Sequence, residues 1–146
     1  MNPVPRNRGG FTLVELMIVV AILGLLFKIV SPRIDDAIRR SQEARTKGNL
    51  AEIRAGINLY KINNNVFPAF LQALTNPPNA VIEKLPLKYT PPYHPEGNTA
   101  SNGTTRDIFD ARGDWFYFND PSEPEYGSVV VNCTHADIKG KRWQDY

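Results

Sequence analysis

The chain has 146 residues, a length that suits one domain with an appendage. It carries 17 basic and 15 acidic side chains, for a formal net charge of +2 at pH 7. Arg6 and Arg8 account for that excess, so the chain beyond residue 10 lacks the basic character that favours nucleic-acid binding. Its single cysteine, Cys133, excludes an internal disulfide.

An apolar run extends from Phe11 to Phe27, directly after a basic leader that ends in Gly9 and Gly10. Its seventeen residues are close to the lower limit for a membrane-spanning helix. No small-residue cleavage site follows the run, which argues against removal of the whole segment as a secretory signal. One carboxylate, Glu15, lies inside the run, and such a charge costs about 2.5–3.5 kcal/mol at the centre of an inserted helix. We therefore expect Glu15 to have a partner.

The segment around Glu15 resembles the class III leader and N-terminus of type IV pilins and type II secretion pseudopilins. The residues that carry the resemblance are Gly10-Phe11-Thr12-Leu13-Val14-Glu15-Leu16-Met17. The resemblance implies cleavage between Gly10 and Phe11 by a prepilin peptidase, N-methylation of Phe11 and a role for Glu15 in assembly. It divides the chain into a leader (1–10), a hydrophobic membrane and assembly half of a long helix (11–32), and the rest of that helix with a globular pilin head (33–146).

Elementary electrostatics supports a pairing of Glu15 with the new N-terminus. Cleavage would create a positive amine at Phe11 within the apolar phase, and Glu15 of a neighbouring subunit can neutralise it. Removing either partner would leave a buried unpaired charge, at a cost of several kcal/mol. The alternative is that Glu15 lies near the membrane interface and contacts water.

The resemblance also implies a structural subunit, not an enzyme, which polymerises with copies of itself into a type IV pilus-like filament. The implied partners are the prepilin peptidase, an inner-membrane assembly platform, minor pilins or pseudopilins and, before assembly, membrane lipid. The implied location is the bacterial inner membrane, with one membrane pass and the head in the periplasm, and then the filament, at the cell surface in the case of a pilus. Basic residues that follow the run favour the opposite orientation by the positive-inside rule: Lys28, Arg33, Arg39 and Arg40.

Several functional alternatives stay open. The missing disulfide favours a secretion pseudopilin, or a pilin that braces its C-terminal region in another way. The segment from Tyr60 to Pro68 also favours a pseudopilin, whereas the C-terminal sequence Trp143-Gln144-Asp145-Tyr146 does not resemble a major pseudopilin ending. A minor pilin would instead act as an adhesion or DNA-binding module through the loop Pro86–Gly113. A membrane-anchored enzyme would use Cys133 and His135.

Apolar periodicity predicts one helix from near Phe11 to about Ile62. Its C-terminal part has apolar residues at alternating spacings of three and four, which place them on one face: Leu50, Ile53, Ile57 and Tyr60. Gly24 and Pro32 weaken the helix. The resemblance implies local melting there, and the alternative is an ordinary membrane-helix kink. Asn63-Asn64-Asn65 is expected to end the helix.

Beyond the helix, the pattern predicts a small head. Phe70, Leu71 and Leu74 suggest a short helix, and Pro86–Gly113 is rich in Pro, Gly, Asn and Thr, which predicts an exposed loop. Two strands, 115–118 and 128–133, are expected to form an antiparallel hairpin that packs on the helix. The predicted fold class is α+β: a type IV pilin-like ladle, with the long N-terminal helix packed on a small antiparallel sheet.

Two groups of residues suggest metal or nucleophile chemistry. Cys133, His135 and Asp137 alternate, so an extended strand would place them on one face. Without a second cysteine, and with His94 expected in a remote loop, we favour a structural role for them. Calcium is the other candidate, since major pseudopilins often hold it in their C-terminal loop. The candidate ligands are Asp120, Glu123, Glu125 and Asp137. Their spacing is not that of an EF-hand, and a polar turn is the alternative.

Overall fold

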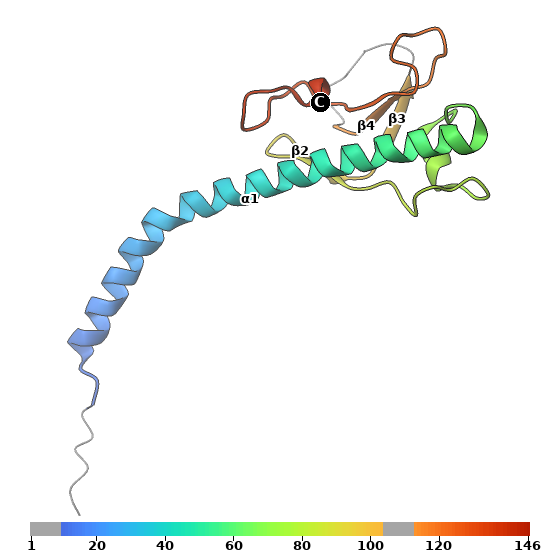
Figure 1. Cartoon of the computed structure of the whole chain (residues 1–146). Coiled ribbons are helices and arrows are strands. Elements are labelled where there is room, and N and C mark those ends of the chain that lie inside the picture. The colour runs from blue at the N-terminus through green and yellow to red at the C-terminus, as the bar shows by residue number, and fades with distance from the viewer. Residues whose placement is uncertain (1–9, 104–112) are drawn as a thin grey trace, which may run out of the picture. The chain divides into compact units, whose positions relative to one another are not determined.

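The computed structural model describes residues 10–103 and 113–146 (Figure 1). The chain divides into two compact units, one up to Ile38 and the other from Arg39 to Tyr146. We call them the N-terminal segment and the head, and describe each by itself. Gly9, Arg6 and Arg8 of the leader lie outside the described residues, as does the part of the predicted loop Pro86–Gly113 that spans 104–112.

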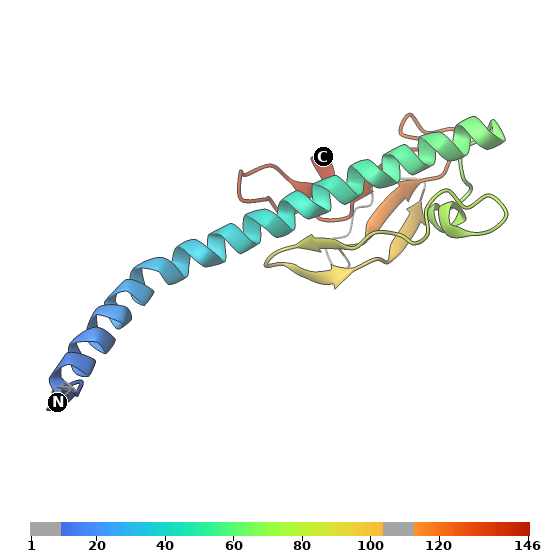
Figure 2. The ribbon, with the colours of Figure 1, turned by 60° about the horizontal axis from the view of Figure 1, so that its bottom comes forward.

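The helix α1 extends from Leu13 to Asn64, within two residues of the predicted bounds. It is continuous through Gly24 and Pro32 (Figure 2). Asn65 follows with φ of 58°, a left-handed conformation that asparagine tolerates better than most residues and that ends a helix. The predicted stop at the three asparagines is therefore confirmed. Local melting at Gly24 or Pro32 concerns the assembled state and stays a prediction.

The head contains two small sheets. In one, β1 (Lys88–Thr90) pairs antiparallel with β2 (His94–Gly97). In the other, β4 (Trp115–Phe118) lies between β3 (Ala100–Gly103) and β5 (Val129–Val131). The β4–β5 pair is antiparallel, as predicted, whereas β3 pairs with β4 in parallel. The α+β fold is thus confirmed, and the predicted antiparallel sheet is corrected to a mixed one.

The prediction of one exposed loop from Pro86 to Gly113 is wrong for its described part, which contains β1, β2 and β3. A long-range contact accounts for the part of the difference that concerns β1. The hydroxyl of Thr46 on α1 accepts from the Tyr89 amide at 2.8 Å and donates to the Tyr89 carbonyl at 2.7 Å. Thr46 therefore satisfies both backbone groups of Tyr89, which composition alone does not reveal.

The core forms between the second half of α1 and the three-stranded sheet (Figures 1 and 2). In the predicted stripe, Leu50, Ile53 and Ile57 are at most 2 % exposed, and Tyr60 is partly buried. It packs in one cluster with residues of β4 and β5 and with two short 3-10 helices, η1 (Leu71–Thr75) and η2 (Trp143–Asp145). Trp143 is fully buried in this cluster and anchors the C-terminal tail there.

Candidate functional site

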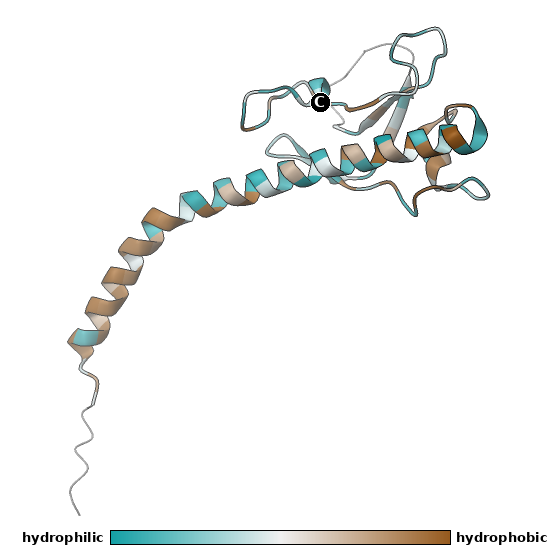
Figure 3. Cartoon of the chain, viewed as in Figure 1, coloured by the Kyte–Doolittle hydropathy of each residue, from teal (hydrophilic) through white to brown (hydrophobic). Residues whose placement is uncertain are grey.

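The N-terminal segment leaves its apolar side chains uncovered. Large apolar residues from Phe11 to Val30 are 43–74 % exposed. Within the described residues, α1 is the one helix that is long and apolar enough to cross a membrane. The apolar part of this helix is not buried inside the protein. In Figure 3 the ribbon of this stretch is coloured mostly as hydrophobic, with a hydrophilic position near its start. An apolar surface of this extent requires lipid or another protein to cover it.

Glu15 takes part in a capping box at the start of α1. Its Oε2 accepts hydrogen bonds from the Thr12 amide and the Thr12 hydroxyl, both at 2.9 Å. The Glu15 amide donates in return to the Thr12 hydroxyl at 3.2 Å. Since the helix begins at Leu13, Thr12 is the N-cap residue and Glu15 is the third helical residue, the positions of a Thr-x-x-Glu box.

Sequence reasoning missed this role, although the Thr-x-x-Glu spacing was a visible signal. The capping box gives Glu15 a partner within its own chain, so a partner from another subunit is not needed to explain the residue in the isolated chain. Pairing of Glu15 with the Phe11 amine of a neighbouring subunit concerns the assembled state and stays a prediction. Gly10 is exposed and has open space around it, and Phe11 is 73 % exposed. The bond between them is accessible to a peptidase.

Polar contacts in the head attach the C-terminal tail to α1. The carboxylate of Asp137 accepts from Lys47 Nζ at 2.5 Å and from the Tyr146 hydroxyl at 2.6 Å. Its other oxygen accepts from the amides of Lys139 and Lys141, both at 2.9 Å. The side chain of Asp137 is fully buried. We call Lys47, Asp137 and Tyr146 the C-terminal brace.

Opposing effects set the pKa values within the brace. Burial raises the pKa of the Asp137 carboxyl, but the hydrogen bonds from Lys47, Tyr146 and two backbone amides outweigh it and hold this pKa well below its usual value. Burial likewise lowers the pKa of Lys47, and the contacts with Asp137 and Tyr146 outweigh it and raise the pKa. The pair is therefore charged at neutral pH.

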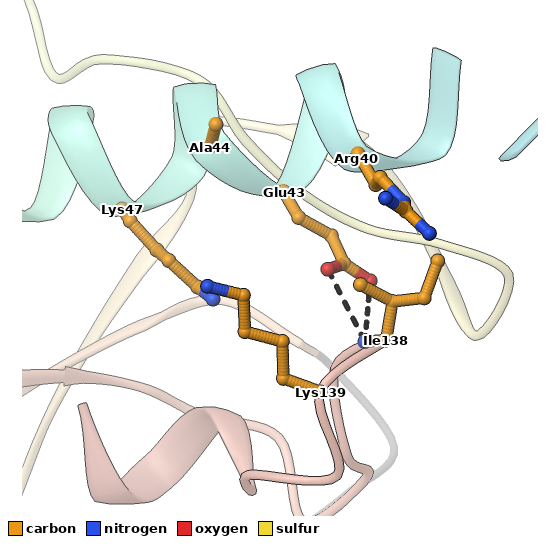
Figure 4. A pocket seen from close by; sticks show the side chains of 6 residues that line it. All are labelled: Arg40, Glu43, Ala44, Lys47, Ile138 and Lys139. Carbon is orange, nitrogen blue, oxygen red and sulfur yellow. Dashed lines mark hydrogen bonds between the residues drawn. The ribbon is translucent and has the colours of Figure 1, made fainter. Parts of the chain in front are cut away.

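A pocket lies beside the brace, between α1 and the turn that follows Asp137 (Figure 4). Glu43, which is 2 % exposed, points into this region and accepts from the Ile138 amide at 3.1 and 3.2 Å. Arg54 donates to the carbonyls of Val129 at 3.0 Å and Tyr146 at 2.5 Å. These contacts fix the tail without a disulfide.

The four candidate calcium ligands belong to two different parts of the head. Asp120 accepts from the Ser122 amide at 2.8 Å and from its hydroxyl at 2.7 Å, within the β4–β5 connection. Glu123 and Glu125 lie in the same connection, whereas Asp137 belongs to the brace. No observation tests calcium binding, which stays a prediction.

Cys133 and His135 do lie together, with Cys133 Sγ 3.6 Å from His135 Nδ1. The expectation that His94 is remote is wrong. His94 begins β2, and its ring centroid lies 5.6 Å from that of His135. Asp137 faces the brace instead of this cluster. Lys88 is buried nearby: burial lowers its pKa, and electrostatic interactions with Asp114 and Cys133 oppose that shift.

The sequence of this chain is similar to those of several known proteins. Residues 5–27 match the prokaryotic N-terminal methylation motif. The type II secretion system core protein G of Pseudomonas aeruginosa is 36% identical over 69 residues, 47% of this chain and 49% of that protein. Its counterpart in Aeromonas hydrophila is 32% identical over 81 residues, 53% of this chain and 57% of that protein.

A type IV major alpha-pilin of Moraxella bovis is 47% identical over 49 residues, 34% of this chain and 31% of that protein. The chain thus spans about half the length of the first secretion relatives that it matches. No solved structure matches it significantly. The chain carries a prokaryotic N-terminal methylation motif and is similar to both type II secretion core protein G and a type IV pilin.

Proposed function

We propose that this chain is a non-enzymatic structural subunit that polymerises, after removal of residues 1–10 and methylation of Phe11, into a type IV pilus-like filament. The observation that carries the proposal is the exposed apolar surface of α1, which begins at the accessible Gly10–Phe11 bond and contains one carboxylate. The methylation motif at residues 5–27 supports the processing step.

The exposed apolar surface of α1 is covered first by lipid and then by neighbouring subunits. Before assembly, lipid covers the side chains from Leu13 to Val30, and the head stays in the periplasm. In the filament, the same side chains pack on neighbouring helices. Transfer from lipid to helix brings little hydrophobic gain, since both environments are apolar. A specific polar contact is then needed to favour and align assembly, and Glu15 paired with the neighbouring Phe11 amine supplies it.

Between the two filament types, we favour the type II secretion pseudopilus. The similarity to core protein G extends over 47–53% of this chain in the relatives named above, against 34% for the pilin. The brace and Arg54 hold the C-terminal tail of this one-cysteine chain without a disulfide, which a pilin can do as well, so the choice rests on the extent of the similarity.

Processing is tested by replacing Gly10. Gly10→Val should leave the full-length precursor in the membrane, because a branched side chain obstructs the bond to be cut. Gly48→Val is the matched control, since Gly48 is also a glycine with open space around it but lies within the head. Mass spectrometry of the membrane fraction distinguishes precursor, mature and methylated chains. Normal processing of Gly10→Val would refute the cleavage assignment.

The filament type is tested by electron microscopy of sheared cells at native expression. A pseudopilus subunit stays in the cell envelope, and its deletion blocks export of secreted enzymes. Long external fibres that disappear with the deletion, together with normal export, would show a surface pilus instead.

A further inference from the structure

The head gathers all of the chain's histidine and cysteine side chains at one place. The sequence contains two histidines and one cysteine. The ligand atoms of His94, Cys133 and His135 all lie within 4.8 Å of one another. Cys133 and His135 follow β5, whereas His94 begins β2, 39 positions before Cys133. The fold, not local sequence, creates this cluster.

The separation of two of these atoms already fits a tetrahedral metal. Bond lengths of about 2.3 Å to sulfur and 2.0–2.1 Å to nitrogen, at tetrahedral angles, place the two ligand atoms about 3.5 Å apart. The observed distance from Cys133 Sγ to His135 Nδ1 is 3.6 Å. The ligand atom of His94 lies within 4.8 Å of the other two, so the set closes around a metal after a side-chain movement of at most about 1.5 Å.

Each ligand is held by its surroundings. Cys133 is fully buried in the core, and the Gln144 amide donates to its carbonyl at 3.1 Å. The His135 ring stacks on Tyr93, with centroids 3.7 Å apart and an interplanar angle of 7°. His94 is 9 % exposed and lies against the backbone of Gly113, where a Cβ would come within 2.6 Å of His94 Cδ2. Side chains positioned in this way lose little freedom when they bind a metal.

We infer that His94, Cys133 and His135 form a zinc site. A thiolate with two imidazoles is a donor set that suits Zn²⁺ and does not suit Ca²⁺ or Mg²⁺, which prefer oxygen. His135 is half-buried, so water can reach the fourth position. The site is distinct from the N-terminal segment and independent of the proposed assembly role of Glu15.

Zinc bound by these three residues has a structural consequence. The ion joins the two-stranded sheet to the segment after β5, and it closes a long loop, which restricts the unfolded chain as a disulfide would. The buried Lys88 acts against it, since its charge repels a cation. Asp114, which is 4 % exposed and attracts the charge of Lys88, reduces that repulsion.

Cobalt is the spectroscopic probe, because Co²⁺ occupies zinc sites and absorbs strongly when bound to thiolate. The full chain in detergent micelles should bind one Co²⁺ with a sulfur-to-cobalt charge-transfer band, and equimolar Zn²⁺ should remove the band. Cys133→Ser should abolish the band, and His94→Gln and His135→Gln should each lower the zinc affinity by at least about 100-fold. Asp120→Asn, an exposed acid outside the cluster, is the control and should bind as the unmodified chain does.

Circular dichroism of each variant without metal separates lost binding from lost folding. If Cys133→Ser does not fold, His94→Gln decides, because His94 lies at the edge of the core. The inference is overturned if the unmodified chain shows no charge-transfer band, or if folded His94→Gln binds zinc as tightly as the unmodified chain. It is also overturned if Asp120→Asn loses as much affinity as the histidine variants, which would indicate weak surface binding.

Discussion

Large apolar side chains between Phe11 and Val30 are 43–74 % exposed, whereas those that line the core of the head are at most 8 % exposed. The two regions share one helix and similar residue types, so local propensity does not explain the contrast. The contrast arises because the two halves of the helix differ in their surroundings. The second half packs on the sheets of the head, whereas the first half is not covered by other described residues. Residues of the same type should therefore stabilise the fold in the head and the assembled filament in the N-terminal segment.

The sharpest test of this contrast compares two isoleucines of α1. Ile53→Ala should lower the free energy of unfolding of the head by about 2–5 kcal/mol, because Ile53 is fully buried and truncation leaves a cavity. Ile22→Ala, at a side chain that is 52 % exposed, should leave that free energy unchanged within about 0.5 kcal/mol. Denaturant unfolding of both variants in detergent micelles measures the difference. Equal losses would contradict the separation of the two roles.

A smaller effect is expected at the brace. Asp137→Asn should lower the free energy of unfolding by about 1.5–3 kcal/mol, since charged hydrogen bonds to a buried carboxylate are weakened. The folded pKa of Asp137 lies below its ordinary value of 3.8, so its stabilisation is complete above about pH 4. It decreases as the pH falls through the folded pKa. Unfolding measured from pH 7 to pH 2 should therefore show an acid-side slope that Asp137→Asn reduces, and an unchanged slope would refute the assignment.

The smallest effect is expected at an exposed ion pair of the head. Arg45 pairs with Glu96, but their side chains are 53% and 44% exposed. Solvent and salt screen such a pair, so Arg45→Ala should cost only about 0.2–1 kcal/mol. Unfolding at low and high salt provides the measurement. A loss as large as that of Asp137→Asn would show that exposure is a poor guide to the strength of these pairs.

The sequence was most informative where the pattern is local. The period of Leu50, Ile53 and Ile57 predicted the helix and its buried face, and the valines of β5 predicted a strand. The capping box at Thr12 and Glu15 is also local, and its Thr-x-x-Glu spacing is visible in the sequence.

Contacts between distant residues were not predictable from the chain alone. β1 depends on Thr46, which lies 43 residues before Tyr89, and the brace joins Lys47 to a carboxylate 90 residues later. The approach of His94 to Cys133 likewise depends on how the two sheets pack. The composition of a segment indicates whether it is polar, but it does not indicate which of its polar groups form hydrogen bonds with distant residues.

The capping role of Glu15 makes its charge the central question, and two substitutions separate the two roles. Glu15→Gln removes the charge, but glutamine also fits a capping box; Thr12→Ala removes the N-cap hydroxyl and keeps the charge. The measurement is the fraction of processed subunit recovered in filaments, with Glu52→Gln, an exposed glutamate of the same helix, as control. We predict that Glu15→Gln is processed but assembles about tenfold less or worse, whereas Thr12→Ala and Glu52→Gln assemble nearly normally. Normal filaments from Glu15→Gln would contradict the account.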